Sequence, residues 1–322
     1  MFLDSSDIQQ NQTLEADITI IGAGAAGITL AREFTNTKAK ILLVESGDLE
    51  FDKPTQDLYI GDVVGHDFPP LDASRLRYFG GTTNHWGGFS RPLDPLDFEK
   101  RRYVPYSGWP FPRSHLDPFY ARAQPICQLG PLDYSETSWT QEGNVPLRLR
   151  RNVIDAAQIF QSPSRLLFAE IYGDELKNAG NVLVIFNSNV TDIDVNEDAR
   201  AVTRLNIVSL AGKRYWVKSS AYVLATGGIE NARILLNADS KQATGLGNAH
   251  GNVGRFFMDH PIIGESGCLQ FNRDAPPLYF YRHRQMNGIV ATGFFALAAE
   301  QQRKEELLNC VILIDPVRLT EQ

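Results

Sequence analysis

Three glycines near the N-terminus have the spacing of a turn that binds a pyrophosphate: Gly22, Gly24 and Gly27. They follow a β-branched apolar run at residues 16–21 and precede an apolar helical segment at residues 28–34. In such a turn the first glycine permits the tight bend, and the second lets the backbone approach phosphates at the helix N-terminus. The third glycine lets the helix pack closely on the strand, so the spacing predicts dinucleotide binding.

An acidic residue completes this pattern. A second apolar run at residues 41–44 ends in Glu45, which gives a strand, a helix and a parallel second strand. A carboxylate at that place accepts a hydrogen bond from the ribose of a bound dinucleotide. The alternative is a glycine-rich turn in an unrelated α/β protein, and the motif alone does not separate NAD from FAD.

A second glycine-rich segment, residues 75–92, reads RLRYFGGTTNHWGGFSRP. Because it has little side-chain bulk at each end, its backbone suits close approach to a flat polar ring. The alternative is a glycine-rich hairpin with a buried tryptophan. Two further segments have small residues at a turn: residues 222–236 read YVLATGGIENARILL, and residues 246–261 read LGNAHGNVGRFFMDHP.

The order of these four segments resembles the glucose–methanol–choline (GMC) family of FAD-dependent oxidoreductases. The resemblance covers residues 17–261 and is weaker beyond them. It implies that FAD, rather than NAD, is the cofactor. Carried over by position, the cofactor-binding residues are Gly22, Gly24, Ala25, Ala26, Gly27, Glu45, Gly80, Gly81, Thr82, Thr83, Asn84, His85, Val190, Ala225, Thr226 and Gly227.

The second segment departs from the usual family pattern. Trp86 stands where typical members have an asparagine, and the run Thr-Asn-His-Trp is similar to the pyranose oxidase branch. In that branch the histidine of a Thr-His-Trp sequence carries the flavin covalently. His85 occupies its place, although Asn84 replaces the threonine before it. The resemblance therefore makes His85 the candidate for covalent attachment. The alternative is that His85 only hydrogen-bonds the cofactor or packs under Trp86.

The activity that the resemblance implies is oxidation of the CH–OH group of a sugar, polyol or other small alcohol. Hydride passes to flavin N5 and the electrons then pass to oxygen or another acceptor. Family members carry their catalytic histidine, with a histidine or asparagine partner, in a C-terminal stretch that we do not find up to Gln322.

The catalytic residues are therefore unknown. We expect a C-terminally incomplete chain, with a partner chain or an oligomer covering the missing part. The alternatives are a catalytically silent FAD-binding fragment or assembly partner, and a GMC-fold flavoprotein with non-alcohol chemistry.

Composition excludes several other classes of protein. The 322 residues are 43% hydrophobic, enough for a large core, and the net charge of −7 argues against nucleic-acid binding. No apolar run approaches the roughly 18 residues of a membrane helix, and the polar N-terminus does not resemble a secretory signal. The three cysteines and the histidines lack the spacing of zinc ligands or of a disulfide framework. We therefore expect a cytoplasmic protein without a bound metal.

The elements that position these motifs predict an α/β fold. We expect a Rossmann-like FAD-binding domain with a parallel sheet, at residues 15–92 and 152–263, and a second, sheet-based substrate domain that begins at residues 264–322 and is incomplete. Proline is concentrated between residues 92 and 146, so residues 93–151 form an irregular, aromatic-rich excursion. Further expectations are a disordered lead-in at residues 1–14 and an antiparallel meander at residues 182–186, 201–209 and 214–218.

Overall fold

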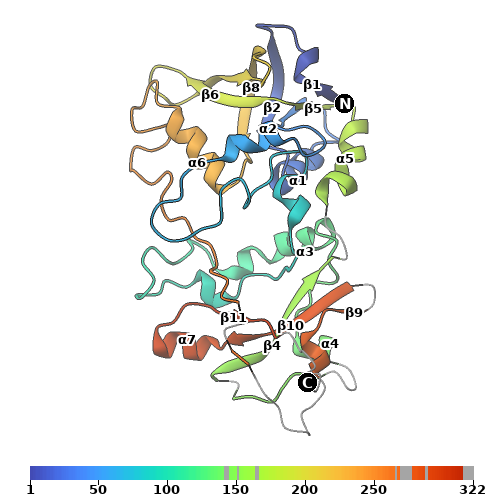
Figure 1. Ribbon diagram of the computed structural model, residues 1–322, viewed down its shortest axis with the longest axis vertical. Helices are drawn as coiled ribbons and strands as arrows, with labels where there is room; N and C mark the ends of the chain where they lie inside the picture. Colours follow the sequence, from blue (N-terminus) through green and yellow to red (C-terminus); the bar gives the residue numbers. More distant parts are fainter. Residues whose placement is uncertain are drawn as a thin grey trace, which may run out of the picture. The chain divides into compact units, whose positions relative to one another are not determined.

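The computed structural model describes residues 1–140, 145–150, 152–163, 167–264, 267–268, 278–286 and 289–314. The chain divides into two compact units, Met1–Trp86 with Leu167–Ile262 and Gly87–Leu166 with Ile263–Gln322 (Figure 1). The first unit is built on a mainly parallel sheet and the second on an antiparallel sheet, which confirms the expected fold class. No helix in these described ranges is long and apolar enough to span a membrane.

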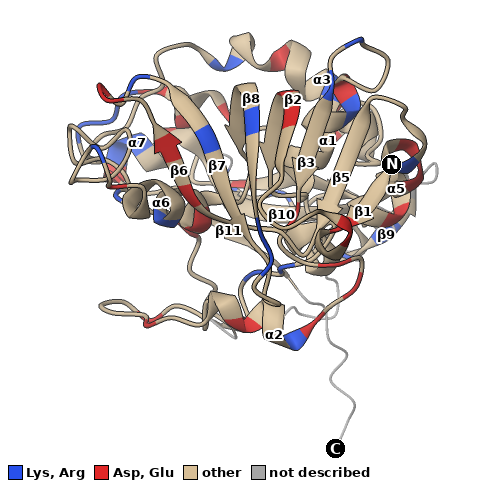
Figure 2. Ribbon diagram, turned by 90° about the horizontal axis from the view of Figure 1, so that it is seen from above, with Lys and Arg blue, Asp and Glu red and all other residues tan. Residues whose placement is uncertain are grey.

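The first unit contains a seven-stranded sheet in the order β1-β5-β3-β2-β8-β7-β6 (Figure 2). The first five strands in this order pair in parallel, and β7 and β6 continue the sheet in antiparallel pairing. The strands are β1 (Phe2–Asp4), β2 (Thr13–Ile21), β3 (Ile41–Val44), β5 (Val182–Phe186), β6 (Asn189–Val195), β7 (Val202–Val208) and β8 (Arg214–Leu224).

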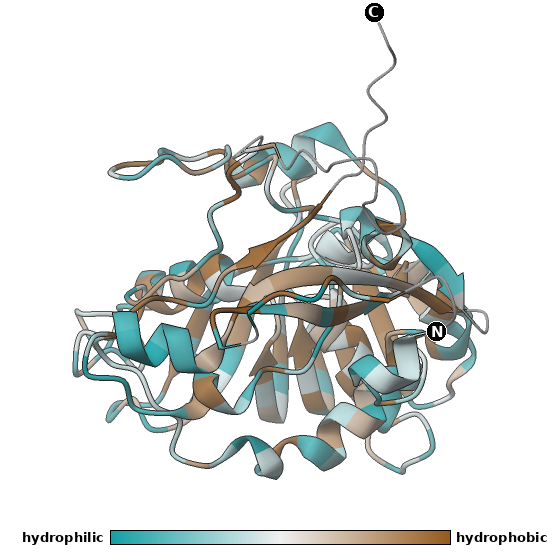
Figure 3. Ribbon diagram, turned by 90° about the horizontal axis from the view of Figure 1, so that it is seen from below, coloured by the Kyte–Doolittle hydropathy of each residue, from teal (hydrophilic) through white to brown (hydrophobic). Residues whose placement is uncertain are grey.

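The central strands β3 and β5 are apolar because both of their faces are covered. All four residues of β3 and four of the five residues of β5 are buried, and Figure 3 shows brown, hydrophobic stretches along strands of the structure. Helices α1 (Ala25–Glu33) and α5 (Phe168–Asn178) pack against each other and against the parallel strands, and α6 (Gly228–Asn237) packs against β6. Shorter helices of this unit are α2 (Lys53–Gln56) and the 3₁₀ helices η1 (Ser5–Asp7), η2 (Asp57–Tyr59) and η3 (Gly81–His85).

Two expectations for this unit are wrong. Residues 182–186 do not belong to an antiparallel meander, because β5 pairs in parallel with both β1 and β3. The first 14 residues are not disordered: β1 lies at the sheet edge, and the ring of Phe2 packs 5.1 Å from that of Phe186. In both segments the local pattern is compatible with several pairings, and the partner strand lies more than 100 residues away.

The second unit is built on a four-stranded sheet in which β10 (Ile289–Leu297) pairs with all three other strands. Those strands are β4 (Ile154–Ser162), β9 (Arg284–Met286) and β11 (Val311–Ile312). Its core includes Ile159, Phe280, Tyr281 and Phe295. The helices are α3 (Asp117–Ile126), α4 (Glu136–Trp139), α7 (Ala299–Glu305), η4 (Pro95–Phe98), η5 (Arg113–His115) and η6 (Leu278–Tyr281).

The boundary of the first unit differs from the predicted FAD-binding domain. Residues 152–163 were predicted to belong to that domain, but β4 pairs with β10 along nearly its whole length and therefore lies in the second unit. Residues 87–92 also belong to the second unit, where Ser90 forms a bridge to Gln161. The β4 run mixes apolar and polar residues and would suit either sheet, so only its pairing assigns it.

Candidate functional site

The first unit has a cavity of about 360 Å³ at the carboxyl ends of three parallel strands. Ile21, Val44 and Leu224 are the last residues of β2, β3 and β8, and all three line it. Ligands of parallel α/β sheets bind outside these strand ends. The volume is within the range of about 300 to 1,000 Å³ that is usual for small-molecule sites.

The glycine turn between β2 and α1 forms one wall of this cavity. A Cβ atom on Gly27 would lie 1.9 Å from the carbonyl oxygen of Gly22, and one on Gly22 would lie 2.8 Å from that of Ala225. These glycines therefore permit the close packing that the spacing predicted. A Cβ atom on Gly24, in contrast, would meet nothing within 4 Å, and Gly24 lines the cavity. The open space at Gly24, beside the N-terminus of α1, is where a bound group can approach the backbone.

Glu45 follows β3 and is 5% exposed. Its carboxylate accepts hydrogen bonds from the backbone amides of Ala23, at 2.7 Å, and Gly47, at 2.9 Å. Each carboxylate oxygen keeps further acceptor capacity, and Glu45 lines the cavity. The residue therefore organises the glycine turn and also presents an acceptor to the cavity.

The second glycine segment lies directly on the first. The amide of Gly80 donates to the carbonyl oxygen of Ala23 at 2.9 Å, and a Cβ atom on Gly81 would lie 3.1 Å from the Cα atom of Gly24. The hydroxyl of Thr83 is buried and donates to the carbonyl oxygen of Gly80 at 2.6 Å, which closes the η3 turn. The two glycine motifs, far apart in sequence, thus form one continuous wall.

The turn between β8 and α6 is held by Asn231. Its Oδ1 atom accepts from both the amide of Thr226, at 3.0 Å, and the hydroxyl of Thr226, at 2.6 Å. This fixes Ala225 and Gly227 where they line the cavity. Two further lining residues are Val190 on β6 and Ser188 just before this strand. The hydroxyl of Ser188 accepts a hydrogen bond of 2.6 Å from the hydroxyl of Tyr215. Burial raises the pKa of Tyr215 to about 12.

Most of the predicted cofactor residues line this one cavity: Gly22, Gly24, Ala25, Ala26, Glu45, Gly81, Thr82, Thr83, Val190, Ala225, Thr226 and Gly227. Gly27, Gly80, Asn84 and His85 do not line it. The Nδ2 atom of Asn84 donates to the carbonyl oxygen of Phe79 at 2.9 Å, so its side chain stabilises the turn. His85 ends η3 and is exposed. Contact between His85 and a flavin stays a prediction.

Sequence reasoning missed several lining residues, among them Tyr59, Arg77 and Glu230. Arg77 and Glu230 lie inside two of the quoted motifs, so proximity to the glycines was the available signal. Tyr59 had no such signal, because it lies in η2, outside every motif.

Within the described residues no group of three or more histidine, cysteine, aspartate or glutamate side chains could hold a metal ion.

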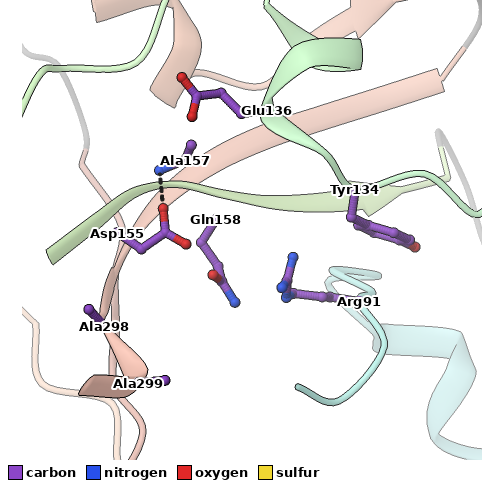
Figure 4. Close-up of a pocket in the computed structure, with 8 residues that line it drawn as sticks. All are labelled: Arg91, Tyr134, Glu136, Asp155, Ala157, Gln158, Ala298 and Ala299. Carbon is purple, nitrogen blue, oxygen red and sulfur yellow. Dashed lines mark hydrogen bonds between the residues drawn. The ribbon is translucent and has the colours of Figure 1, made fainter. Parts of the chain in front are cut away.

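The second unit has a recess of its own, of about 430 Å³ (Figure 4). Arg91 and Gln158 line it and are both held by Asp94, through hydrogen bonds of 2.7 and 3.1 Å to its two carboxylate oxygens. In Figure 4 Asp155 and Gln158 lie on one side of β4, and Glu136 lies across the strand. The recess presents both donors and acceptors to a small polar molecule, and none of the predicted cofactor residues lines it.

No protein-family model matches the chain. Among curated proteins, the fructose dehydrogenase large subunit of Gluconobacter japonicus is 23% identical over 331 aligned positions, which cover 80% of this chain and 60% of that protein. The 2-methyl-1,2-propanediol dehydrogenase of Mycolicibacterium austroafricanum is 23% identical over 349 positions, which cover 87% of this chain and 63% of that protein. The chain spans about three fifths of the length of these curated relatives.

Similar solved structures include pyridoxine 4-oxidase from Mesorbium loti, with 18% identity and a TM-score of 0.45 over 69% of this chain and 51% of that chain. A formate oxidase has 16% identity and a TM-score of 0.42, over 72% of this chain and 48% of that chain. A fungal aryl-alcohol oxidase has 15% identity and a TM-score of 0.46, also over 72% and 48%. These values are too low to transfer a substrate to this chain.

Proposed function

We propose that this chain, whose motif order and α/β fold are those of the glucose–methanol–choline family of oxidoreductases, binds FAD in its first unit. One observation carries the proposal. Separate segments of the chain, around Gly24, Glu45, Thr82, Val190 and Thr226, converge on a single cavity at the carboxyl ends of β2, β3 and β8. The segments around Thr82 and Thr226, which the family resemblance assigns to FAD, line this cavity together with the first glycine motif and Glu45.

The lining residues fit the parts of FAD. The N-terminus of α1 is formed by Gly24, Ala25 and Ala26. Backbone amides in the first turn of a helix have no acceptor within the helix, so the amides of these residues would hold the pyrophosphate. Glu45 would accept from the ribose, and Val190 would lie near the adenine. For these roles the open space at Gly24 and the remaining acceptor capacity of Glu45 support the proposal.

The second glycine segment would lead from the pyrophosphate to the flavin ring. Gly81 lies against Gly24, and Thr82 and Thr83 line the cavity beside it. Gly80, Asn84 and His85 stay predicted cofactor residues on the strength of the family resemblance alone. The flavin supplies hydride acceptance when it is bound, and the protein's part is to hold and orient it.

The activity that we propose is oxidation of a CH–OH group in a sugar, polyol or other small alcohol. Similarity to two curated dehydrogenases, one named for fructose and one for a diol, supports this substrate class. Because the chain spans about three fifths of those proteins, activity, substrate and electron acceptor all belong to the proposal. The alternatives remain a catalytically silent FAD-binding chain and a flavoprotein with non-alcohol chemistry.

Cofactor binding is tested by titrating the purified full chain with FAD and following the quenching of flavin fluorescence. We expect saturable binding of FAD and no comparable binding of NAD. Gly24→Val, which fills the open space, is expected to abolish FAD binding, whereas Gly180→Ala, at a surface glycine that does not line the cavity, is the matched control. A chain that neither carries nor takes up FAD contradicts the proposal.

Activity is tested on the FAD-loaded chain under anaerobic conditions with a panel of sugars, polyols and simple alcohols. Loss of the oxidised flavin absorbance with any of them supports alcohol oxidation. Retained absorbance with every alcohol, in a chain that binds FAD stoichiometrically, favours the silent alternative.

A further inference from the structure

Three arginines surround one buried glutamate beside the cavity. Glu230, in the first turn of α6, accepts at Oε1 from Arg77 Nη1 at 3.3 Å and from Arg233 Nη2 at 2.6 Å. Arg75 Nη1 lies 3.6 Å from Glu230 Oε2. The side chains of Arg75 and Arg77 are 15% and 9% exposed, whereas that of Arg233 is 47% exposed. Positive charge therefore exceeds negative charge within this cluster, and two of its cations are largely removed from water.

An aromatic ring holds the two buried arginines in place. The Cζ atom of Arg75 lies 3.8 Å from the ring centroid of Tyr59, and that of Arg77 lies 4.7 Å from it. Such stacking stabilises a guanidinium that has lost its water. Burial raises the pKa of Tyr59, so its ring stays neutral at physiological pH. The backbone of Arg77 is also fixed, because its amide donates to Gln56 Oε1 at 2.9 Å.

Arg77 lies at the end of the cavity that Glu45 borders. A Cβ atom on Gly47, two residues after Glu45, would lie 2.2 Å from the carbonyl oxygen of Arg77. The Nη2 atom of Arg77 donates to Asn189 Oδ1 at 3.2 Å, and Asn189 directly precedes Val190. Arg77 itself lines the cavity, whereas Arg75 and Arg233 do not. Arg77 therefore contacts Gly47 and Asn189, which lie within two residues of Glu45 and Val190, the residues that we assign to the ribose and the adenine.

The hydrogen-bonding capacity of this cluster is not used up. Arg77 Nε and Arg75 Nη1 are buried and have no hydrogen-bond acceptor among the residues that the structure describes. A buried donor without an acceptor is unfavourable, and a guanidinium gives its strongest hydrogen bonds to anionic or polar oxygen atoms. Protein atoms cover these two donors, but Arg77 itself lines the cavity, so a ligand that presents anionic oxygen atoms there would offset the excess positive charge.

We infer that Arg77 is a recognition residue for the adenosine diphosphate half of the cofactor, held ready by Glu230, Asn189 and the ring of Tyr59. The inference rests on the proposed function, since it assigns a role within the same cavity. It adds a side-chain cation to a site whose other predicted contacts are backbone amides and one carboxylate. A purely structural role is the competing explanation, in which Arg77 only ties the second glycine segment to α6.

The experiment uses ADP, which carries only this half of FAD, and isothermal titration calorimetry with the full chain. Arg77→Met is expected to weaken binding of both ADP and FAD about tenfold or more, as the loss of a charge-assisted hydrogen bond implies. Arg233→Met is the matched control, because Arg233 shares the same Glu230 oxygen but lies outside the cavity. The affinity of the Arg233→Met variant for ADP and for FAD is expected to stay within about threefold of that of the wild type.

Arg77→Lys keeps the proposal testable if Arg77→Met does not fold, as judged by thermal unfolding of the unliganded chain. Lysine keeps the charge but not the fork of donors, so a loss of at least about threefold in ADP affinity is expected. Folded Arg77 variants that bind ADP as tightly as the wild type overturn the inference and leave the proposed function standing. A wild-type chain that binds neither ADP nor FAD overturns both.

Discussion

The backbone amide of Ala23 donates a hydrogen bond of 2.7 Å to Oε2 of Glu45, inside the glycine turn that borders the cavity. The same carboxylate accepts from the amide of Gly47 at 2.9 Å. An acidic residue that the sequence marks as a ligand-binding group therefore also shapes the turn that would hold the ligand. Loss of Glu45 should consequently affect stability as well as binding.

For Glu45 we expect that Glu45→Ala lowers the free energy of unfolding by about 1–3 kcal/mol, because two buried amides lose their acceptor. FAD affinity should fall as well. Glu45→Gln keeps one acceptor oxygen and should lose less of both. Urea unfolding of the unliganded chain and flavin titration measure the two effects separately. Equal unfolding midpoints for Glu45→Ala and the wild type would contradict the structural part of this role.

Gly24 and Gly27 are expected to respond oppositely to the same substitution. Gly27→Ala places a methyl group 1.9 Å from the carbonyl oxygen of Gly22 and should destabilise the unliganded chain by more than about 2 kcal/mol. Gly24→Ala meets only open space and should leave that stability within about 0.5 kcal/mol, while weakening FAD binding. Thermal unfolding with and without FAD distinguishes the two. Equal destabilisation by both variants would refute the assignment of Gly24 to the ligand.

Glu230 should make stability depend on pH in the acid range. Burial alone would raise the pKa of its carboxyl, but the hydrogen bond from Arg233 and the charge of Arg77 outweigh this and lower it. A pKa that is lower in the folded chain gives stability that is fully present above the unfolded value of about 4.3 and is lost as pH falls through the folded value.

Glu230→Gln is therefore expected to cost on the order of 3 kcal/mol at pH 7, since it leaves buried arginines without a countercharge. The difference in the free energy of unfolding between the wild type and Glu230→Gln should stay constant between pH 7 and pH 5 and shrink below about pH 4.3. Urea unfolding at pH 7, 5 and 3.5 measures it. A difference that grows toward acid pH would show that the carboxylate is not stabilised by these arginines.

Tyr281 in the second unit is expected to stabilise the fold through its hydroxyl. The hydroxyl donates to the carbonyl oxygen of Ala156 at 2.9 Å and accepts from the amide of Leu147 at 2.8 Å. Tyr281→Phe should therefore cost about 1–3 kcal/mol, and Tyr279→Phe, at a residue that is 56% exposed, about 0.5 kcal/mol or less. Burial raises the pKa of Tyr281 to about 12, so the cost should not change between pH 6 and pH 9. Chemical denaturation of both variants across this range provides the measurement.

His85 tests the covalent attachment that the pyranose oxidase branch implies. If the imidazole is linked to the flavin, acid precipitation of the FAD-loaded chain should give a yellow pellet, and His85→Ala should release the colour to the supernatant. His85 is exposed at the end of η3, so the substitution should change the stability of the unliganded chain by less than about 0.5 kcal/mol. Complete release of flavin from the unmutated chain rejects the bond.

The amino-acid sequence alone determined the βαβ unit, the paired glycine motifs and the acidic residue after the second strand. These features are local: the spacing of Gly22, Gly24 and Gly27 and the apolar runs around them have few other physical explanations. The fold class followed from them, because a crossover between parallel strands implies a covered sheet.

Only the tertiary structure decided which distant segments meet. It placed β1 beside β5, assigned β4 to the second sheet, and brought Arg77 to Glu230 across 153 residues of chain. Pairing register and ion pairing depend on partners that local pattern does not name, and a buried charge becomes visible only once the surrounding surface is known. For the same reason Tyr59, which belongs to no motif, was found as a wall of the cavity only after the chain was folded.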